Sequence, residues 1–235
     1  MFDSLLAHLN ESIKQHGGKP CRIPSDLARC SSKKSYGIIR NWLWELDGFR
    51  RWRVTSLDAG DKLQVLNSVA YPDYSRDQPL LGVDLLWFGK TSKLVAVLDF
   101  QPLFQDEKYF EKYYQDLKIL KRRFPEMSNA KAMNAYDPKQ YFSPWLLFCK
   151  GGVDQAKNIL PIVFDDFLNS YWNLHNKQLM NSYDVKPYQI KNLHKEYDKY
   201  NYERDPAHGL FTSYFGKDWS ERFLNQFLFP FALLD

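Results

Sequence analysis

One stretch of the sequence decides the fold: residues 51–102, RWRVTSLDAGDKLQVLNSVAYPDYSRDQPLLGVDLLWFGKTSKLVAVLDFQP. It contains four segments rich in valine, leucine and aromatic residues, as strands are: residues 52–59, 63–72, 80–89 and 93–102. Short turn signals separate these segments, such as Ala59-Gly60-Asp61 and the run from Gly89 to Ser92. Because connections this short leave no room for crossover helices, the stretch predicts an antiparallel meander.

Helical patterns lie on both sides of this stretch. Apolar residues recur at helical spacing from Phe2 to Ile13, so the chain is predicted to open with an amphipathic helix. The other predicted segments are a loop over 19–35, a short helix over 36–46, a helix from 106 to 125, an irregular segment over 126–142, a strand over 144–150, and helices over 156–171, 187–197, 206–215 and 218–229. The pattern indicates one domain, residues 1–235, in which helices cover both faces of an antiparallel sheet and the later helices close a pocket.

Composition narrows the class of protein. Hydrophobic residues make up 44% of the 235, which argues against disorder. Aromatic residues make up 17%, which fits either an aromatic core or a pocket for a flat ligand. The net charge is +4, and basic residues cluster at Arg50, Arg51 and Arg53 and again at 121–123. Each cluster is either a solvated surface or a docking face for an acidic partner.

Several common kinds of site have no support in the sequence. The three cysteines form no CxxC pair and the five histidines no HExxH pair, so we expect no metal site and a reducing compartment. Dinucleotide, Walker-type, GxSxG and RNP-like motifs are missing, and we expect no nucleic-acid partner. No apolar run approaches about 18 residues, and the N-terminus carries Asp3 and Glu11 instead of a basic region. A cytoplasmic protein without a membrane partner is therefore expected.

Asp84 stands alone in the apolar run LLGVDLLWFG (residues 80–89). Burial of an ionised carboxylate without a partner is costly, so such a group neutralises or finds a partner. If the strand pairs with LQVLNSVAYP, Asn67 can hydrogen-bond Asp84 or a ligand beside it. Asp84 is then either a structural acid satisfied by backbone or water, or an acid whose raised pKa keeps a proton for donation near neutral pH.

Asp205 lies in RDPAHGLFTSYFGKDW (residues 204–219), where one predicted helix ends and another begins. Asp followed by Pro206 is typical of a helix start, with Asp205 as the N-cap. A capping carboxylate is expected to be held ionised by the helix N-terminus, which argues against proton donation. A catalytic role remains the alternative. Asp99, at the end of its strand, is predicted to be structural.

These stretches closely resemble the ferredoxin-dependent bilin reductases. The resemblance covers essentially the whole chain and is carried by residues 50–75, LLGVDLLWFG (80–89), LVAVLDFQP (94–102), YFSPWLLFCKGG (141–152), ERDPAHGLFTSYFGKDW (203–219) and FLFP (227–230). It implies a three-layer α/β/α sandwich with a central antiparallel sheet flanked by helices. Biliverdin IXα would lie between the sheet and the C-terminal helices.

The resemblance also implies the chemistry. No flavin, metal or nicotinamide is bound; reduced ferredoxin supplies electrons one at a time, the bilin passes through radical states, and protein acids supply protons. The two key aspartates of the family fall on Asp84 and Asp205. Substrate contacts are expected from Asn67, Val69 and Leu210.

The resemblance is strongest to members that reduce biliverdin by two electrons at the C15=C16 methine bridge, giving 15,16-dihydrobiliverdin for phycoerythrobilin biosynthesis. Phycocyanobilin-forming members have a histidine at the position of Asn67 and a glutamate at that of Thr55, and both substitutions remove titratable groups. The product would be released or passed to a second bilin reductase. A four-electron phycoerythrobilin synthase keeps the same two aspartates and stays an alternative, as does a bilin carrier without turnover.

Overall fold

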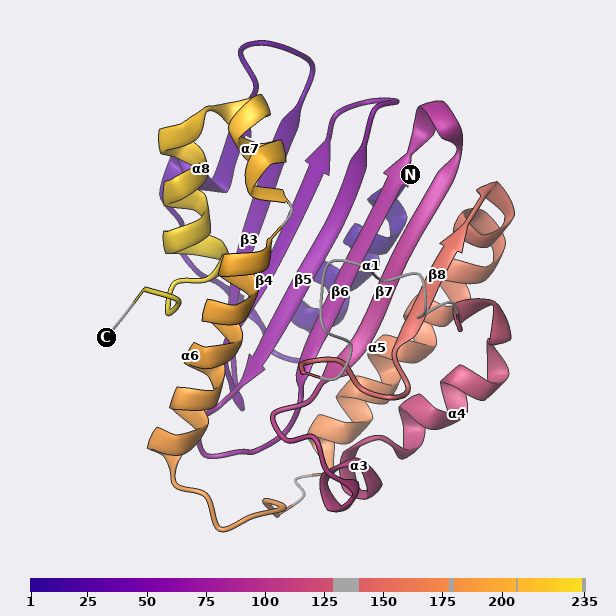
Figure 1. The fold of residues 1–235 in the computed structure, drawn as a ribbon, viewed down its shortest axis with the longest axis vertical. Coiled ribbons are helices and arrows are strands. Elements are labelled where there is room, and N and C mark those ends of the chain that lie inside the picture. Colours follow the sequence, from indigo (N-terminus) through magenta and orange to yellow (C-terminus); the bar gives the residue numbers. More distant parts are fainter. Residues whose placement is uncertain (129–139, 178–179, 206, 234–235) are drawn as a thin grey trace.

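The computed structural model describes residues 1–128, 140–177, 180–205 and 207–233. In this part of the chain eight strands form one antiparallel sheet in the order β1-β3-β4-β5-β6-β7-β8, with β2 also paired to β3 (Figure 1). The strands are β1 Lys19–Pro20, β2 Arg29–Ser31, β3 Ile38–Leu46, β4 Phe49–Asp58, β5 Gln64–Pro72, β6 Leu80–Phe88, β7 Lys93–Gln101 and β8 Leu147–Gly151. Strands β4 to β7 are neighbours both in the chain and in the sheet, so the predicted meander is confirmed.

Helices cover both faces of the sheet, as the sequence predicts. In Figure 1, α1 and α5 lie behind the sheet, and α6, α7 and α8 lie in front of it. The described helices are α1 Asp3–Gln15, α2 Ser25–Ala28, α3 Glu107–Tyr113, α4 Gln115–Arg123, α5 Leu160–Asn176, α6 Pro187–Arg204, α7 Ala207–Phe215 and α8 Lys217–Phe223, with π-helical turns at Gln155–Ile159 and Leu224–Leu228. The arrangement is a three-layer α/β/α sandwich.

Two segments differ from the prediction. Residues Ile38–Leu46 were predicted to be helical but form β3, because this segment pairs along its length with β4 and at its ends with β1 and β2. The predicted loop over 19–35 contains β1, α2 and β2, which are short pieces attached to the edge of the sheet. In both cases pairing with other strands overrides the local sequence pattern. Most of the predicted irregular segment 126–142, as well as Pro206, lies outside the described residues.

The rear face of the sheet holds an aromatic core. Trp52 of β4 is fully buried, and its ring lies 4.9 Å from that of Trp172 and 6.1 Å from that of Tyr171, both on α5. Its indole N–H donates to the hydroxyl of Ser68 over 3.0 Å, so the polar end of this large side chain is satisfied. The high aromatic content therefore fills the layer between the sheet and α5.

Two buried aspartates tie loops to this framework. Asp99 at the end of β7 accepts hydrogen bonds from the backbone N–H and the hydroxyl of Ser143, over 2.7 and 2.6 Å. Burial raises the pKa of Asp99 to about 7, while the bonds from Ser143 lower it. Asp77 accepts hydrogen bonds from Tyr113 and from the backbone N–H of Ser182. These contacts agree with the structural role predicted for Asp99.

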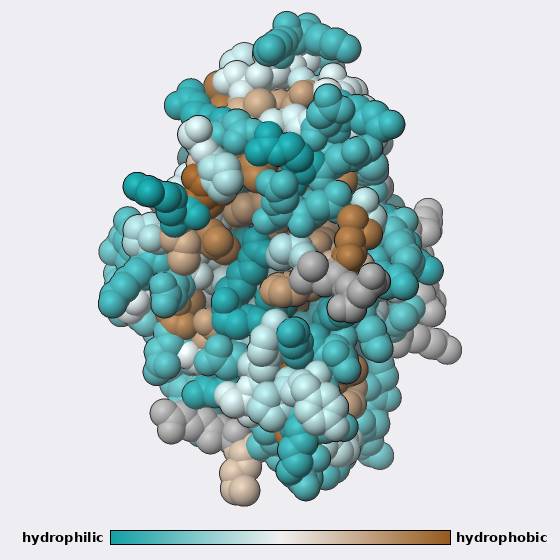
Figure 2. All heavy atoms as spheres, turned by 90° about the vertical axis from the view of Figure 1, so that its left-hand side faces the viewer, coloured by the Kyte–Doolittle hydropathy of each residue, from teal (hydrophilic) through white to brown (hydrophobic). Residues whose placement is uncertain are grey.

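The outer side of the C-terminal helices is a solvent face. Figure 2 shows this side, where hydrophilic side chains dominate and hydrophobic ones occur in small separate groups. The apolar residues of α7 and α8, such as Phe211 and Phe223, are instead buried with Ile39 and Leu57 of the sheet. Within the residues that the structure describes, no helix is long and apolar enough to cross a membrane.

Candidate active site

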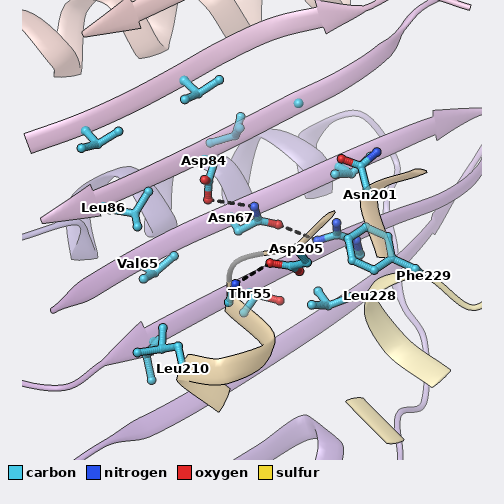
Figure 3. Close-up of a pocket in the computed structure, with 18 of the residues that line it drawn as sticks. Thr55, Val65, Asn67, Asp84, Leu86, Asn201, Asp205, Leu210, Leu228 and Phe229 are labelled. Carbon is cyan, nitrogen blue, oxygen red and sulfur yellow. Dashed lines mark hydrogen bonds between the residues drawn. The ribbon is translucent and has the colours of Figure 1, made fainter. Parts of the chain in front are cut away.

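A cavity of about 540 Å³ lies between the front face of the sheet and the C-terminal helices. Its floor is made of residues from β4 to β8, and its walls include Asp205, Leu210 and Phe229. Most of the lining is apolar, as is typical of a small-molecule site with a few polar groups that fix orientation. Figure 3 shows the polar groups of the floor and Asp205 close to one another.

A row of polar residues runs across four neighbouring strands, and three of its members, Thr55, Asn67 and Asp84, line the cavity floor. Asn41, Thr55, Asn67 and Asp84 are successive partners in the register of β3, β4, β5 and β6. The Thr55 hydroxyl donates to Asn41 Oδ1 over 2.7 Å, and the Asn67 amide N–H donates to Asp84 Oδ1 over 2.9 Å. The predicted pairing of Asn67 with Asp84 is therefore confirmed (Figure 3).

Asp84 is a cavity acid with a raised pKa. Burial and, to a smaller extent, the nearby Asp205 raise its pKa, whereas the hydrogen bond from Asn67 and the charge of Arg53 lower it, and the net pKa is about 6. The side chain is not fully covered because it borders the cavity. Its same-face neighbours in β6, Gly82, Leu86 and Phe88, also line the cavity and offer no charge. Such a group can hold a proton near neutral pH and release it to a ligand in the cavity.

Asp205 lies at the junction of α6 and α7. Its Oδ1 accepts a hydrogen bond from the backbone N–H of Ala207 over 2.7 Å, so the predicted capping contact is confirmed. The direction of its pKa shift is opposite to that expected for a cap, however, because burial raises the pKa of Asp205 and outweighs both that hydrogen bond and the charges of Arg53 and His208. The capping contact therefore does not hold the pKa of this carboxyl group below its usual value.

The remaining predicted site residues also border the cavity. Asn67 and Val69 do so from β5, and Leu210 does so from α7, so the structure brings together residues that are far apart in the sequence. Val69 is a register neighbour of Gly82, where a side chain would collide with Gln101. The space over Gly82 is therefore occupied by the side chain of Gln101, which also lines the cavity.

Arg53 is a cavity residue that the sequence analysis did not place in the site. It is only 2% exposed, and its guanidinium donates to Asn67 Oδ1 over 2.6 Å. The signal that could have found it is strand alternation, because Arg53 precedes Thr55 by two residues and so shares its face of β4. Lys150 of β8 also lines the cavity and is exposed to solvent.

The first basic cluster is not the docking face that was one of its two interpretations, nor is it a solvated surface. Arg51 and Arg53 are buried, and Arg51 donates to the carbonyl oxygen of Phe227. Arg50 lies over the ring of Tyr71, 4.2 Å from its centre. These side chains point inward because β4 is central in the sheet and is covered on both faces. The cluster at 121–123 lies on α4, where Arg122 and Arg123 are exposed.

No group of three or more histidine, cysteine or carboxylate side chains suited to a metal ion occurs among the described residues. The polar groups of the cavity are two acids, an arginine, a lysine, several amides and the hydroxyls of a threonine and a tyrosine. They can bind and protonate a ligand.

Comparison with known proteins relates this site to one family. Residues 6–230 match the sequence profile of the family described as ferredoxin-dependent bilin reductase. A protein of Synechococcus sp. (strain WH7803) described as 15,16-dihydrobiliverdin:ferredoxin oxidoreductase is 56% identical over an alignment of 236 positions, which covers 98% of each chain. A protein of Prochlorococcus marinus (strain NATL1A) with the same description is 52% identical over 233 residues, covering 99% of this chain and 98% of its own.

A solved structure agrees with these matches at the level of the fold. Phytochromobilin synthase from tomato, crystallised in complex with biliverdin, superimposes with a TM-score of 0.84 over 99% of this chain and 84% of the other. The sequence identity is 20%, so this likeness supports the three-layer arrangement alone.

Proposed function

The chain belongs to the ferredoxin-dependent bilin reductases, and from this premise we propose that it reduces biliverdin IXα by two electrons to 15,16-dihydrobiliverdin. Reduced ferredoxin is the electron donor. We propose that residues 1–235 act as one cytoplasmic reductase domain, and that the product leaves directly or passes to a second bilin reductase on the route to phycoerythrobilin. The support for the specific reaction is the description shared by relatives at 52–56% identity over nearly the whole chain.

One observation carries the mechanism: the carboxyl group of Asp84 has a pKa of about 6 in a mostly apolar cavity. Reduction of the C15=C16 double bond adds two electrons and two protons. Two molecules of reduced ferredoxin supply the electrons one at a time, so the bilin passes through a radical state. An acid with a pKa near 6 keeps a protonated fraction near neutral pH and can supply a proton to a ligand in the cavity.

Asp205 is proposed as the second acid. It borders the same cavity, and burial raises its pKa as well. Asn67, Val69 and Leu210 would contact the bilin from the floor and the wall. The row beside Asp84 offers amide and hydroxyl groups at Asn67 and Thr55 and no further titratable group, which favours a short reduction over a multistep one.

The decisive experiment is anaerobic turnover of biliverdin with reduced ferredoxin, followed by chromatography against bilin standards. We expect 15,16-dihydrobiliverdin, with absorption at shorter wavelength because conjugation ends at the reduced bridge. Phycoerythrobilin formed by this protein alone would identify a four-electron synthase. A spectrum that shifts when biliverdin binds but does not change further with ferredoxin would identify a carrier.

Ferredoxin docking is proposed at the basic end of α4, since the arginines of β4 are turned inward. Arg122 is exposed there, while Lys121 donates to the carbonyl oxygen of Pro144 and Arg123 pairs with Asp166 at 2.8 Å. Arg122→Glu should weaken ferredoxin-driven turnover most strongly at low salt, because charges are screened beyond about 8 Å at physiological ionic strength. The control is Lys191→Glu, an exposed charge reversal on α6. Equal turnover of both variants across a salt series would reject this docking site.

A further inference from the structure

We propose that Arg53 is a positioning residue for this reduction: acting through Asn67, it keeps the acid proton of Asp84 on the carboxyl oxygen that is free to face the substrate. The inference deepens the proposed function and rests on it for the identity of the proton acceptor. The arrangement of the three side chains can be tested without any bilin.

The first step concerns the orientation of the Asn67 amide. An arginine guanidinium carries only N–H donors, so the group that faces it must be an acceptor. Arg53 Nη1 lies 2.6 Å from Asn67 Oδ1, and the amide NH2 group therefore points the other way (Figure 3). That group lies 2.9 Å from Asp84 Oδ1. The chemistry of Arg53 thus determines which end of Asn67 reaches the acid.

The second step concerns the proton on Asp84. Because Oδ1 accepts the amide N–H, the hydrogen of the neutral carboxylic acid is placed on Oδ2. If the Asn67 amide turned over, its oxygen would face Asp84 and would accept the acid hydrogen in a hydrogen bond. The proton would then be held against the sheet and away from a ligand. Arg53 opposes this turn, since it would bring two sets of donors together.

The third step concerns why Arg53 can hold this position. Its side chain is 2% exposed and lies over the ring of Phe229, 5.5 Å from its centre. Its Nε has no hydrogen-bond partner among the described residues, so the contact with Asn67 is a large part of what satisfies the group. A buried guanidinium held in this way has little freedom to move from Asn67.

Charges around the pair determine the sign of its electrostatic effect. Arg53 on β4 lowers the pKa of Asp84 on β6 and that of Asp205 at the α6–α7 junction, while Asp205 raises that of Asp84. Further charged or titratable neighbours of these groups are Arg50, Arg51, Tyr71, Asp198 and His208. Removal of the Arg53 charge should raise the pKa of both acids, which by itself would favour the protonated form. Loss of orientation should lower turnover, so the two effects have opposite signs.

The test compares Arg53→Met, which removes both donor and charge, with Arg53→Lys, which keeps a cationic donor. For Arg53→Met we expect the low-pH plateau of turnover to fall by about tenfold or more, as for a misplaced acid. The high-pH limb of its pH–turnover profile should move to higher pH. Arg53→Lys should restore part of the plateau and part of the position of this limb. A residue that served only to stabilise the fold would lower the plateau without moving the limb. Turnover within about twofold of wild type with an unchanged limb would overturn the proposal, as would equal losses in both variants without a shift.

A second measurement keeps Arg53 unchanged and needs no bilin. In the wild-type protein, the side-chain NH2 signals of Asn67 should titrate with Asp84 near pH 6, and Asp84→Asn should abolish that titration. If the Asn67 NH2 signals do not change with pH near 6, or change equally in Asp84→Asn, the proposal is overturned. This outcome applies even if Arg53→Met does not fold. If wild-type protein fails to reduce biliverdin while this titration is seen, the proposed function fails, whereas the contact between Asn67 and Asp84 stands.

Discussion

The two faces of the sheet are built from the same strands but differ in packing and in polarity. On the rear face, Leu81, Val83 and Leu85 of β6 are at most 2% exposed and belong to the core under α1 and α5. On the front face, Gly82 and Asp84 of the same strand border a cavity of about 540 Å³. The rear face is packed without polar interruption along β6, whereas the front face keeps an acid and an open space.

The comparison teaches that alternate positions along a strand separate the residues that stabilise the fold from those that line the cavity. Alternate residues of one strand point to opposite faces, so each face can change without repacking the other. Burying a carboxyl group costs free energy, and the packed rear face offsets that cost. We expect substitutions on the front face to change chemistry and substitutions on the rear face to change stability. Four predictions test this division.

The largest effect should come from Asp84→Asn, which preserves size and removes the transferable proton. Turnover of bilin should fall by about 10²–10⁴-fold, the range of a general acid, while binding and folding remain. Bilin titration, single-turnover kinetics and thermal unfolding would be compared with those of the wild type. A folded Asp84→Asn protein with wild-type turnover would show that the front-face acid is structural.

The next effect contrasts two adjacent residues of β7. Leu98 is fully buried on the rear face, and Val97 is half-buried at the cavity. Leu98→Ala should lower the free energy of unfolding by about 2–5 kcal/mol because it leaves a void in a packed core, whereas Val97→Ala should cost about 1 kcal/mol or less. Denaturant titrations measure both. Similar losses would mean that the two faces are equally packed.

The pH dependence of stability should reveal the cost of the front-face acid. The pKa of Asp84 is about 6 in the folded protein, against about 3.9 in an unfolded chain. The folded state therefore binds this proton more tightly, and the stability it contributes at low pH is lost as the pH rises through about 6. Asp84→Asn should be close to wild type in stability near pH 4 and gain about 1–3 kcal/mol above pH 7.

The control for that comparison is Asp61→Asn, which changes an exposed aspartate in the turn between β4 and β5. It should show no such gain between pH 4 and pH 7. If Asp84→Asn and Asp61→Asn behave alike, the carboxyl group of Asp84 is better solvated than its place beside the cavity indicates.

The smallest expected effect separates the two roles of Asp205. Asn caps a helix nearly as well as Asp, so Asp205→Asn should keep its thermal stability, whereas Asp205→Ala should lose about 1 kcal/mol. We expect both variants to lose turnover, because each removes a cavity acid with a raised pKa. Full turnover of Asp205→Asn would leave capping as its only role and would confine proton donation to Asp84.

The sequence indicated a contact between Asn67 and Asp84 because each is a polar residue in an otherwise apolar strand. The structure confirms that the two strands pair and that Asn67 donates to Asp84, whereas the catalytic role of Asp84 stays a prediction. Prediction failed for the pKa of Asp205, since the capping contact is local but its burial depends on the sheet that α6 and α7 cover.

By itself the sequence determined the order and direction of β4 to β7, the helices around them and the candidacy of Asp84, because alternation, helical spacing and turn residues act over a few positions. Only the tertiary structure decided that Ile38–Leu46 is a strand and that Arg51 and Arg53 point inward. In a strand covered on both faces, neither face contacts water, so the alternation of polar and apolar residues does not show where a side chain points. The direction of an arginine is then determined by partners such as Asn67 and Phe227, which the chain brings to it only on folding.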